Sequence, residues 1–88
     1  MTQAAVEALL DTVHFEVWRR ELGGPNISLY THHRYETYKL AAHRCDTLNE
    51  NAGNRYRDQW LDYDETWDSK PILWYYFPVE TTSTRKLA

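Results

Sequence analysis

The residues best suited to a specific interaction lie between positions 58 and 68. Five carboxylates put a charge of −5 into eleven residues that contain no Lys or Arg, and three large rings lie among them. The carboxylates are Asp58, Asp62, Asp64, Glu65 and Asp68, and the rings are Trp60, Tyr63 and Trp67. Carboxylates pair with the Arg and Lys of a basic groove, while Trp and Tyr bury a large area at little entropic cost. This pattern predicts a surface that docks on a basic partner; alternatively, the rings complete a thin core and the carboxylates keep that edge soluble.

Metal binding and catalysis are poorly supported by the remaining candidates. His32, His33, His43 and Cys45 are zinc-ligand types, but positions 43 and 45 of a helix point about 200° apart and cannot share one ion. The same angle separates the Cys45 thiol from a His43 base, and a thiol in an apolar stripe is normally inert. Asp62 and Asp64 lack a glycine-rich or histidine partner for acid–base or Mg²⁺ chemistry. We therefore predict no enzyme, no metal and no cofactor.

Direct nucleic-acid binding is the main alternative function. The basic residues outside the acidic segment include Arg19, Arg20, Arg34, Lys39, Arg44, Arg55 and Arg57. Trp18 and Tyr30 are available to stack on bases. Against this stand a pI near 5.7 and three acids interleaved on the predicted helix, Glu36, Asp46 and Glu50. A third alternative is a structural protein whose aromatic residues build a homo-oligomer, such as a homodimer.

Size and composition favour one small soluble domain. The chain has 88 residues, a net charge of −3 and thirteen aromatic residues, more than so small a core can hide. A single cysteine forbids an internal disulfide and favours a reducing, cytoplasmic compartment. There is no apolar run long enough to span a membrane and no basic region followed by an apolar stretch, so neither a membrane span nor a signal peptide is expected.

Strand patterns occur at both ends of the chain. Residues 72–80 are apolar on both faces, which favours the central strand of a sheet. Pro71 and Pro78 enclose residues 72–77, and we expect them to limit the strand because proline has no N–H for a ladder. Residues 12–22 and 26–32 alternate around a Gly-Gly-Pro-Asn turn and predict an antiparallel hairpin. A single helix through Leu22 competes for the first of these segments, because apolar residues at 6, 10, 13 and 17 also fit a helical spacing.

The main helix is predicted at residues 34–51. Its apolar stripe runs through Tyr38, Ala41, Ala42, Cys45, Leu48 and Ala52. Gly53 follows as a typical C′ residue. Residues 54–70 form an acidic aromatic insertion in which we predict a short helical stretch, although the alternation from Tyr56 to Asp62 also fits a strand. A short N-terminal helix capped by Thr2 and a loose polar tail at 81–88 complete the chain.

These elements predict an α+β domain over residues 1–80, a three-stranded antiparallel sheet with one main helix on one face. The Gly-Gly-Pro-Asn hairpin, the helix ending Asp-Thr-Leu-Asn-Glu-Asn-Ala-Gly and the strand Tyr-Tyr-Phe-Pro-Val-Glu together resemble the layout of small phage-encoded proteins, including anti-CRISPR inhibitors. That resemblance covers residues 13–53 and 72–80 and implies a phage inhibitor acting in the host cytoplasm. It points to a host protein or nucleoprotein complex with a basic groove as the partner, such as a CRISPR effector, with no small-molecule substrate.

Overall fold

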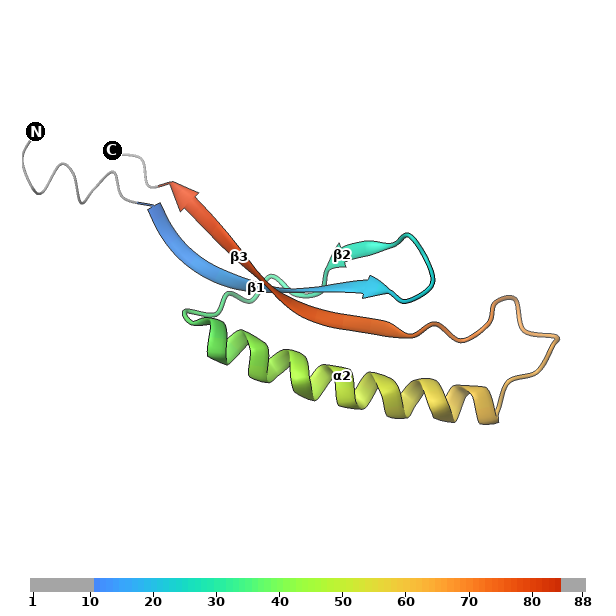
Figure 1. The fold of residues 1–88 in the computed structure, drawn as a ribbon. Coiled ribbons are helices and arrows are strands. Elements are labelled where there is room, and N and C mark those ends of the chain that lie inside the picture. Colours follow the sequence, from blue (N-terminus) through green and yellow to red (C-terminus); the bar gives the residue numbers. More distant parts are fainter. Residues whose placement is uncertain (1–10, 85–88) are drawn as a thin grey trace, which may run out of the picture.

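A computed structural model of the chain describes residues 11–84, which form three strands and one long helix (Figure 1). The elements are β1 (Asp11–Glu21), β2 (Ile27–Leu29), α2 (Tyr38–Leu61) and β3 (Trp74–Thr84). The strands form one antiparallel sheet in the order β2-β1-β3. The predicted α+β architecture, with a hairpin rather than a helix after residue 11, is therefore confirmed. The short N-terminal helix that we predicted lies outside the described residues.

The central strand is β1, and the prediction that residues 72–80 are central is wrong. β1 pairs with β3 along its whole length, from Asp11 opposite Thr84 to Glu21 opposite Trp74, and with β2 at residues 18–20. β3 lies at the edge of the sheet. Its apolar run has two causes: Trp74 and Tyr76 pack toward α2, while Tyr75 and Phe77 stack on each other on the opposite face, where Tyr75 is half exposed.

Pro78 lies inside β3 instead of ending it. The N–H of Tyr30 donates to the C=O of Val17 over 3.0 Å, so the backbone of Val17 points toward the β2 side of the sheet. Val17 and Pro78 therefore oppose each other as a pair without mutual hydrogen bonds, and the proline nitrogen faces the outer edge. Residues 81–84, which we had assigned to a loose tail, continue the strand and pair with residues 11–14. Three of those four are threonines, whose β-branched side chains favour strands.

The outer edge of β3 is closed by an amide side chain from the helix. The N–H of Tyr76 donates to Oδ1 of Asn49 over 2.7 Å, and Nδ2 of Asn49 donates to the C=O of Tyr76 over 2.9 Å. Asn49 thus makes the two bonds that a neighbouring strand would make. Together with Pro78, which has no N–H to offer, it protects the edge from pairing with another chain.

The helix starts later and ends later than predicted. Thr37 is its N-cap, with the hydroxyl oxygen accepting from the N–H of Leu40 over 3.2 Å, and Asp62 follows its last turn. Gly53 therefore lies inside α2 and does not end it. A glycine inside a helix costs only about 1 kcal/mol, and continuing the helix places Tyr56 and Trp60 in aromatic contacts. The predicted insertion is accordingly helix up to Leu61 and loop from residue 62 to 73.

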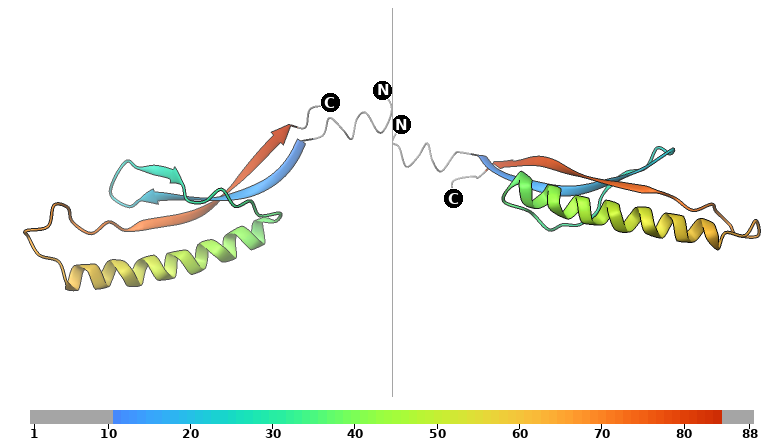
Figure 2. Two further views of the ribbon diagram at one scale, coloured as in Figure 1. Left: turned by 180° about the vertical axis from the view of Figure 1, so that it is seen from behind. Right: turned by 60° about the horizontal axis from the view of Figure 1, so that its bottom comes forward.

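The core lies between α2 and one face of the β1–β3 pair (Figure 2). Val17, Cys45, Leu48 and Tyr76 form the buried cluster, with Tyr35, Ala52 and Trp74 packed against it. Ala41 is also fully buried, and small helix residues such as this let the helix approach the sheet closely. Because side chains alternate along a strand, Arg19 lies on this helix-facing side, opposite Tyr76.

The other face of the sheet carries a second aromatic group. Trp18 pairs there with Phe77 on one side and with Leu29 on the other, and the rings of Tyr75 and Phe77 are stacked with their centroids 6.4 Å apart. His14, which strand alternation puts on the same face as Trp18, is buried. Within residues 11–84, α2 is the only helix, and it lies on the opposite face.

Candidate functional site

The predicted aromatic residues form a chain of ring contacts at one end of the molecule. Tyr56 contacts Trp60 with ring centroids 6.1 Å apart, Trp60 contacts Tyr63 at 5.0 Å, and Tyr63 contacts Trp67 at 5.6 Å. Trp60 is 41% exposed and Trp67 44% exposed, so each ring is held on one side and open on the other. Tyr56, outside our predicted site, belongs to the same stripe at helical spacing.

The turn after α2 brings Trp67 back to the helix. The backbone N–H of Tyr63 donates to the C=O of Trp60 over 3.3 Å, and that of Trp67 donates to the C=O of Asp64 over 2.9 Å. Oδ1 of Asp64 accepts from the N–H of Thr66 over 3.0 Å. Asp64 therefore contributes a negative charge to the loop and also stabilises its conformation. Asp side chains commonly make such hydrogen bonds to the backbone in turns.

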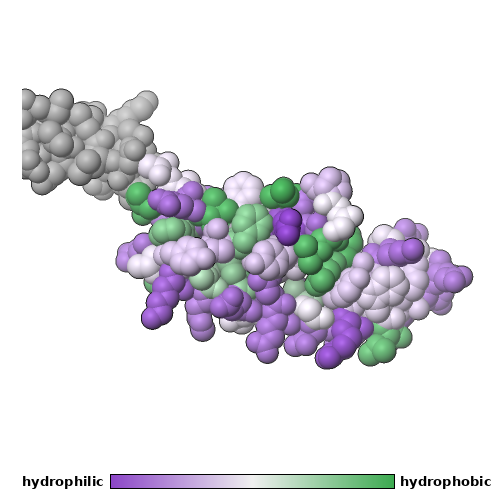
Figure 3. Space-filling model, in the orientation of Figure 1, coloured by the Kyte–Doolittle hydropathy of each residue, from purple (hydrophilic) through white to green (hydrophobic). Residues whose placement is uncertain are grey.

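The five predicted carboxylates lie on the last turn of α2 and the loop that follows, and Asp58 points about 200° away from the rings of Tyr56 and Trp60. Asp58, Asp62, Asp64, Glu65 and Asp68 are all exposed. None of Trp60, Tyr63 and Trp67 belongs to the buried core cluster, which lies nearer the middle of the helix. We call these four rings and five carboxylates the acidic aromatic tip. Figure 3 shows hydrophilic side chains along the outer side of α2 and hydrophobic groups over the sheet.

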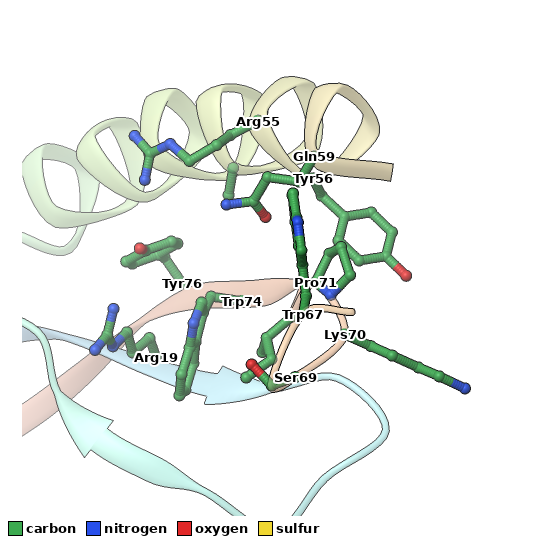
Figure 4. Close-up of a pocket in the computed structure, with 12 residues that line it drawn as sticks. Arg19, Arg55, Tyr56, Gln59, Trp67, Ser69, Lys70, Pro71, Trp74 and Tyr76 are labelled. Carbon is green, nitrogen blue, oxygen red and sulfur yellow. The ribbon is translucent and has the colours of Figure 1, made fainter. Parts of the chain in front are cut away.

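A cleft of about 350 Å³ lies beside the tip, between α2 and the start of β3 (Figure 4). The helix supplies Ala52, Arg55, Tyr56 and Gln59, the sheet supplies Arg19, Trp74 and Tyr76, and the loop supplies Trp67, Ser69, Lys70, Pro71 and Ile72. The guanidinium carbon of Arg19 lies 4.2 Å from the centroid of the Trp74 ring. Residues 18–20, 52–59 and 67–76 are far apart in the sequence, and no local spacing in the sequence predicts this cleft.

Cys45 and the histidines do not assemble into a reactive site. Cys45 lies in the core, and burial raises the pKa of its thiol, with a smaller contribution in the same direction from the Asp46 carboxylate. A thiol held in its protonated form is a poor nucleophile. Over residues 11–84 there is no group of three or more His, Cys, Asp and Glu side chains placed to hold a metal ion.

Comparison of the chain with protein-family models, with curated proteins and with solved structures found no match. The part of the chain that the structure describes contains no helix of the length and apolarity needed to cross a membrane. The resemblance of layout to phage inhibitors stays a prediction.

Proposed function

We propose that this chain is a non-enzymatic binding protein that docks its acidic aromatic tip on a basic site of another protein. The target class is a nucleic-acid-handling protein or complex of the cytoplasm, for example a CRISPR effector if the chain is phage-encoded. The observation that carries the proposal is the row of four contacting rings, of which Trp60 and Trp67 are about half exposed, on a segment that carries five exposed carboxylates.

The rings are suited to be the anchors of such an interface. Each ring is already fixed by its neighbours, so little side-chain entropy is lost when a partner covers the open side. Trp and Tyr are the residues that most often dominate the binding energy of protein interfaces, particularly at the centre of the contact. The row of rings from Tyr56 to Trp67 would form that centre.

The carboxylates supply the specificity. Exposed acids around an aromatic centre attract a basic surface, accelerate the encounter and disfavour acidic partners. A groove that holds phosphates presents the Arg and Lys that carboxylates pair with. The target would therefore be a surface that otherwise binds nucleic acid, and docking would block it.

The decisive experiment compares two triple variants of equal charge change. The tip variant combines Asp58→Asn, Glu65→Gln and Asp68→Asn, and it leaves Asp64 in place because that side chain holds the loop. The control variant combines Glu36→Gln, Asp46→Asn and Glu50→Gln, which are exposed residues outside the tip. Wild type and both variants are used as bait in a bacterial lysate, and the affinity of the captured protein is then measured with purified components.

We expect the wild type and the control to retain a nucleic-acid-binding protein that competing oligonucleotide displaces. The tip variant should bind that protein about a hundredfold more weakly, on the basis of about 1 kcal/mol per lost charged contact. Equal binding by the tip variant, or a captured protein indifferent to oligonucleotide, would overturn the proposal.

A further inference from the structure

The cleft between α2 and β3 has a charge opposite to that of the tip beside it. Three cationic residues line the cleft: Arg19, Arg55 and Lys70. Within residues 11–84, no Asp or Glu lines it. The chain as a whole has 13 acidic and 10 basic residues, so a cleft whose charged residues are all basic differs from the average composition of the chain. An anion is the ligand that such a lining attracts.

Arg19 is held ready to bind this anion. Its guanidinium lies over the Trp74 ring at 4.2 Å, and this cation–π contact orients the group without using its hydrogen-bond donors. Its Nε is buried and has no hydrogen-bond partner in the structure. Because Nε is closed to solvent, the anion would be bound by the terminal N–H groups of the guanidinium, whose orientation the contact with Trp74 fixes. Guanidinium groups match phosphate geometry well, since two parallel N–H groups can donate to two oxygens.

The cleft also offers flat apolar surfaces. Trp67 and Trp74 line it from the loop and the strand, and Tyr56 lines it from the helix (Figure 4). Arg55 extends along the helix on the same side of the cleft as Arg19, with the Tyr76 ring between the two, whereas Lys70 extends outward at the rim. Bases stack on such rings without need of sequence-specific bonds. The volume of about 350 Å³ lies at the lower end of the range for small-molecule sites, which suits one nucleotide and not a longer ligand.

We propose that this cleft binds a single nucleotide, with the phosphate on the side of the cleft that carries Arg19 and Arg55 and the base against Trp67 and Trp74. The nucleotide is either free or the 5′-phosphorylated end of a single strand. This site shares the rings of Tyr56 and Trp67 with the tip but uses other charged groups: the acids of the tip point to a protein, whereas the basic residues of the cleft point to a phosphate.

The test measures binding by isothermal titration calorimetry, with tryptophan fluorescence as a second readout. The probes are AMP, adenosine, and a short oligothymidylate with and without a 5′-phosphate. The variants are Arg55→Gln in the cleft and Arg57→Gln as the matched control. Arg57 is exposed on the same helix but does not line the cleft, because residues two apart on a helix point in different directions. Arg19→Gln is a second cleft variant, used after urea unfolding has shown that it folds.

We expect AMP or the 5′-phosphorylated oligonucleotide to bind, with adenosine and the unphosphorylated strand at least tenfold weaker. Arg55→Gln should weaken binding about tenfold or more, and Arg57→Gln should leave it within twofold, by the arithmetic for one charged hydrogen bond. The tighter of the two phosphorylated probes identifies the source of the nucleotide. Absence of binding, equal binding of adenosine and AMP, or equal loss in the two helix variants would overturn the proposal. The tip variant with Asp58, Glu65 and Asp68 neutralised should bind nucleotide normally, which keeps this test independent of the docking test.

Discussion

Replacing Asn49 by alanine should destabilise the protein more than alanine at an exposed position of α2 does. The Asn49 side chain makes two hydrogen bonds to the backbone of Tyr76, of 2.7 and 2.9 Å, and both are partly buried. Each such bond contributes about 1 kcal/mol net, and leaving a partly buried peptide group without a partner adds to the loss. Alanine recovers roughly 0.5 kcal/mol of helix propensity. The expected loss in the free energy of unfolding is about 2 kcal/mol.

Urea unfolding followed by far-UV circular dichroism measures this loss, and the Tm should fall by about 10 °C for a domain of this size. Asn51→Ala is the control, because Asn51 is exposed on the same helix and alanine there changes the propensity alone. Asn49→Asp sharpens the test. The introduced carboxylate still accepts from the N–H of Tyr76 but faces its C=O without a proton to donate.

The C=O should raise the pKa of that introduced carboxyl in the folded state, because only the protonated form can donate to it. A raised folded-state pKa gives stability that is present at low pH and is lost as the pH rises through that pKa. The difference between Asn49→Asp and wild type should therefore shrink toward pH 3–4, near the ordinary pKa of about 3.9. If Asn49→Ala is as stable as Asn51→Ala, the bonds to Tyr76 do not hold the edge of β3 and the reasoning fails.

Three further predictions concern the helix. Gly53→Ala should stabilise the protein by roughly 0.5–1 kcal/mol, because Gly53 lies inside α2 with open space around its missing Cβ; an unchanged or lower urea midpoint would contradict this. Thr37→Ala should destabilise it by about 1 kcal/mol through loss of the N-cap bond to Leu40, while Thr37→Ser should restore most of that stability in thermal unfolding. Burial raises the pKa of the Cys45 thiol in the folded state. The stability that depends on the protonated thiol is therefore present below the unfolded-state pKa of about 8.5, and it is lost as the pH rises through the folded-state pKa. In urea titrations at increasing pH, Cys45→Ala should lose less stability at alkaline pH than wild type does. Parallel pH profiles of the two proteins would show that the Cys45 thiol does not cause the alkaline loss.

The sequence predicted which elements exist but not where they sit in the sheet. Alternation identified the strand around Val17, an uninterrupted apolar run identified the strand around Tyr76, and the helical spacing of Cys45 and Leu48 identified the helix, because each pattern is set within a local element. The central position of β1 depends on which strand pairs with which. That choice is made by contacts between distant residues. The apolar sequence of β3 would be the same at the centre of the sheet as at its edge.

The predicted helix end at Gly53 and strand end at Pro78 are wrong for the same physical reason. Both residues often end elements, but the cost depends on the local setting: Gly53 lacks the positive φ of a C′ residue, and Pro78 falls where its nitrogen faces outward. Carrying the helix past Gly53 brings the ring of Tyr56 to Trp60, and so adds Tyr56 to the row of ring contacts. The cleft could not be predicted, because Arg19, Arg55 and Trp74 come from three elements that meet only in the folded chain.

The pairing of Asp11 with Thr84 has a practical consequence for handling the protein. These residues lie side by side at one end of the β1–β3 ribbon, and the loop from residue 62 to 73 lies at the other end (Figure 1). Eleven strand residues span about 35 Å. A tag, fluorophore or second protein fused beyond either residue would therefore be held at a distance from the rings and carboxylates. A sensor chip that holds the protein by such a fusion would be joined to the end of the β1–β3 ribbon that lies away from the acidic aromatic tip.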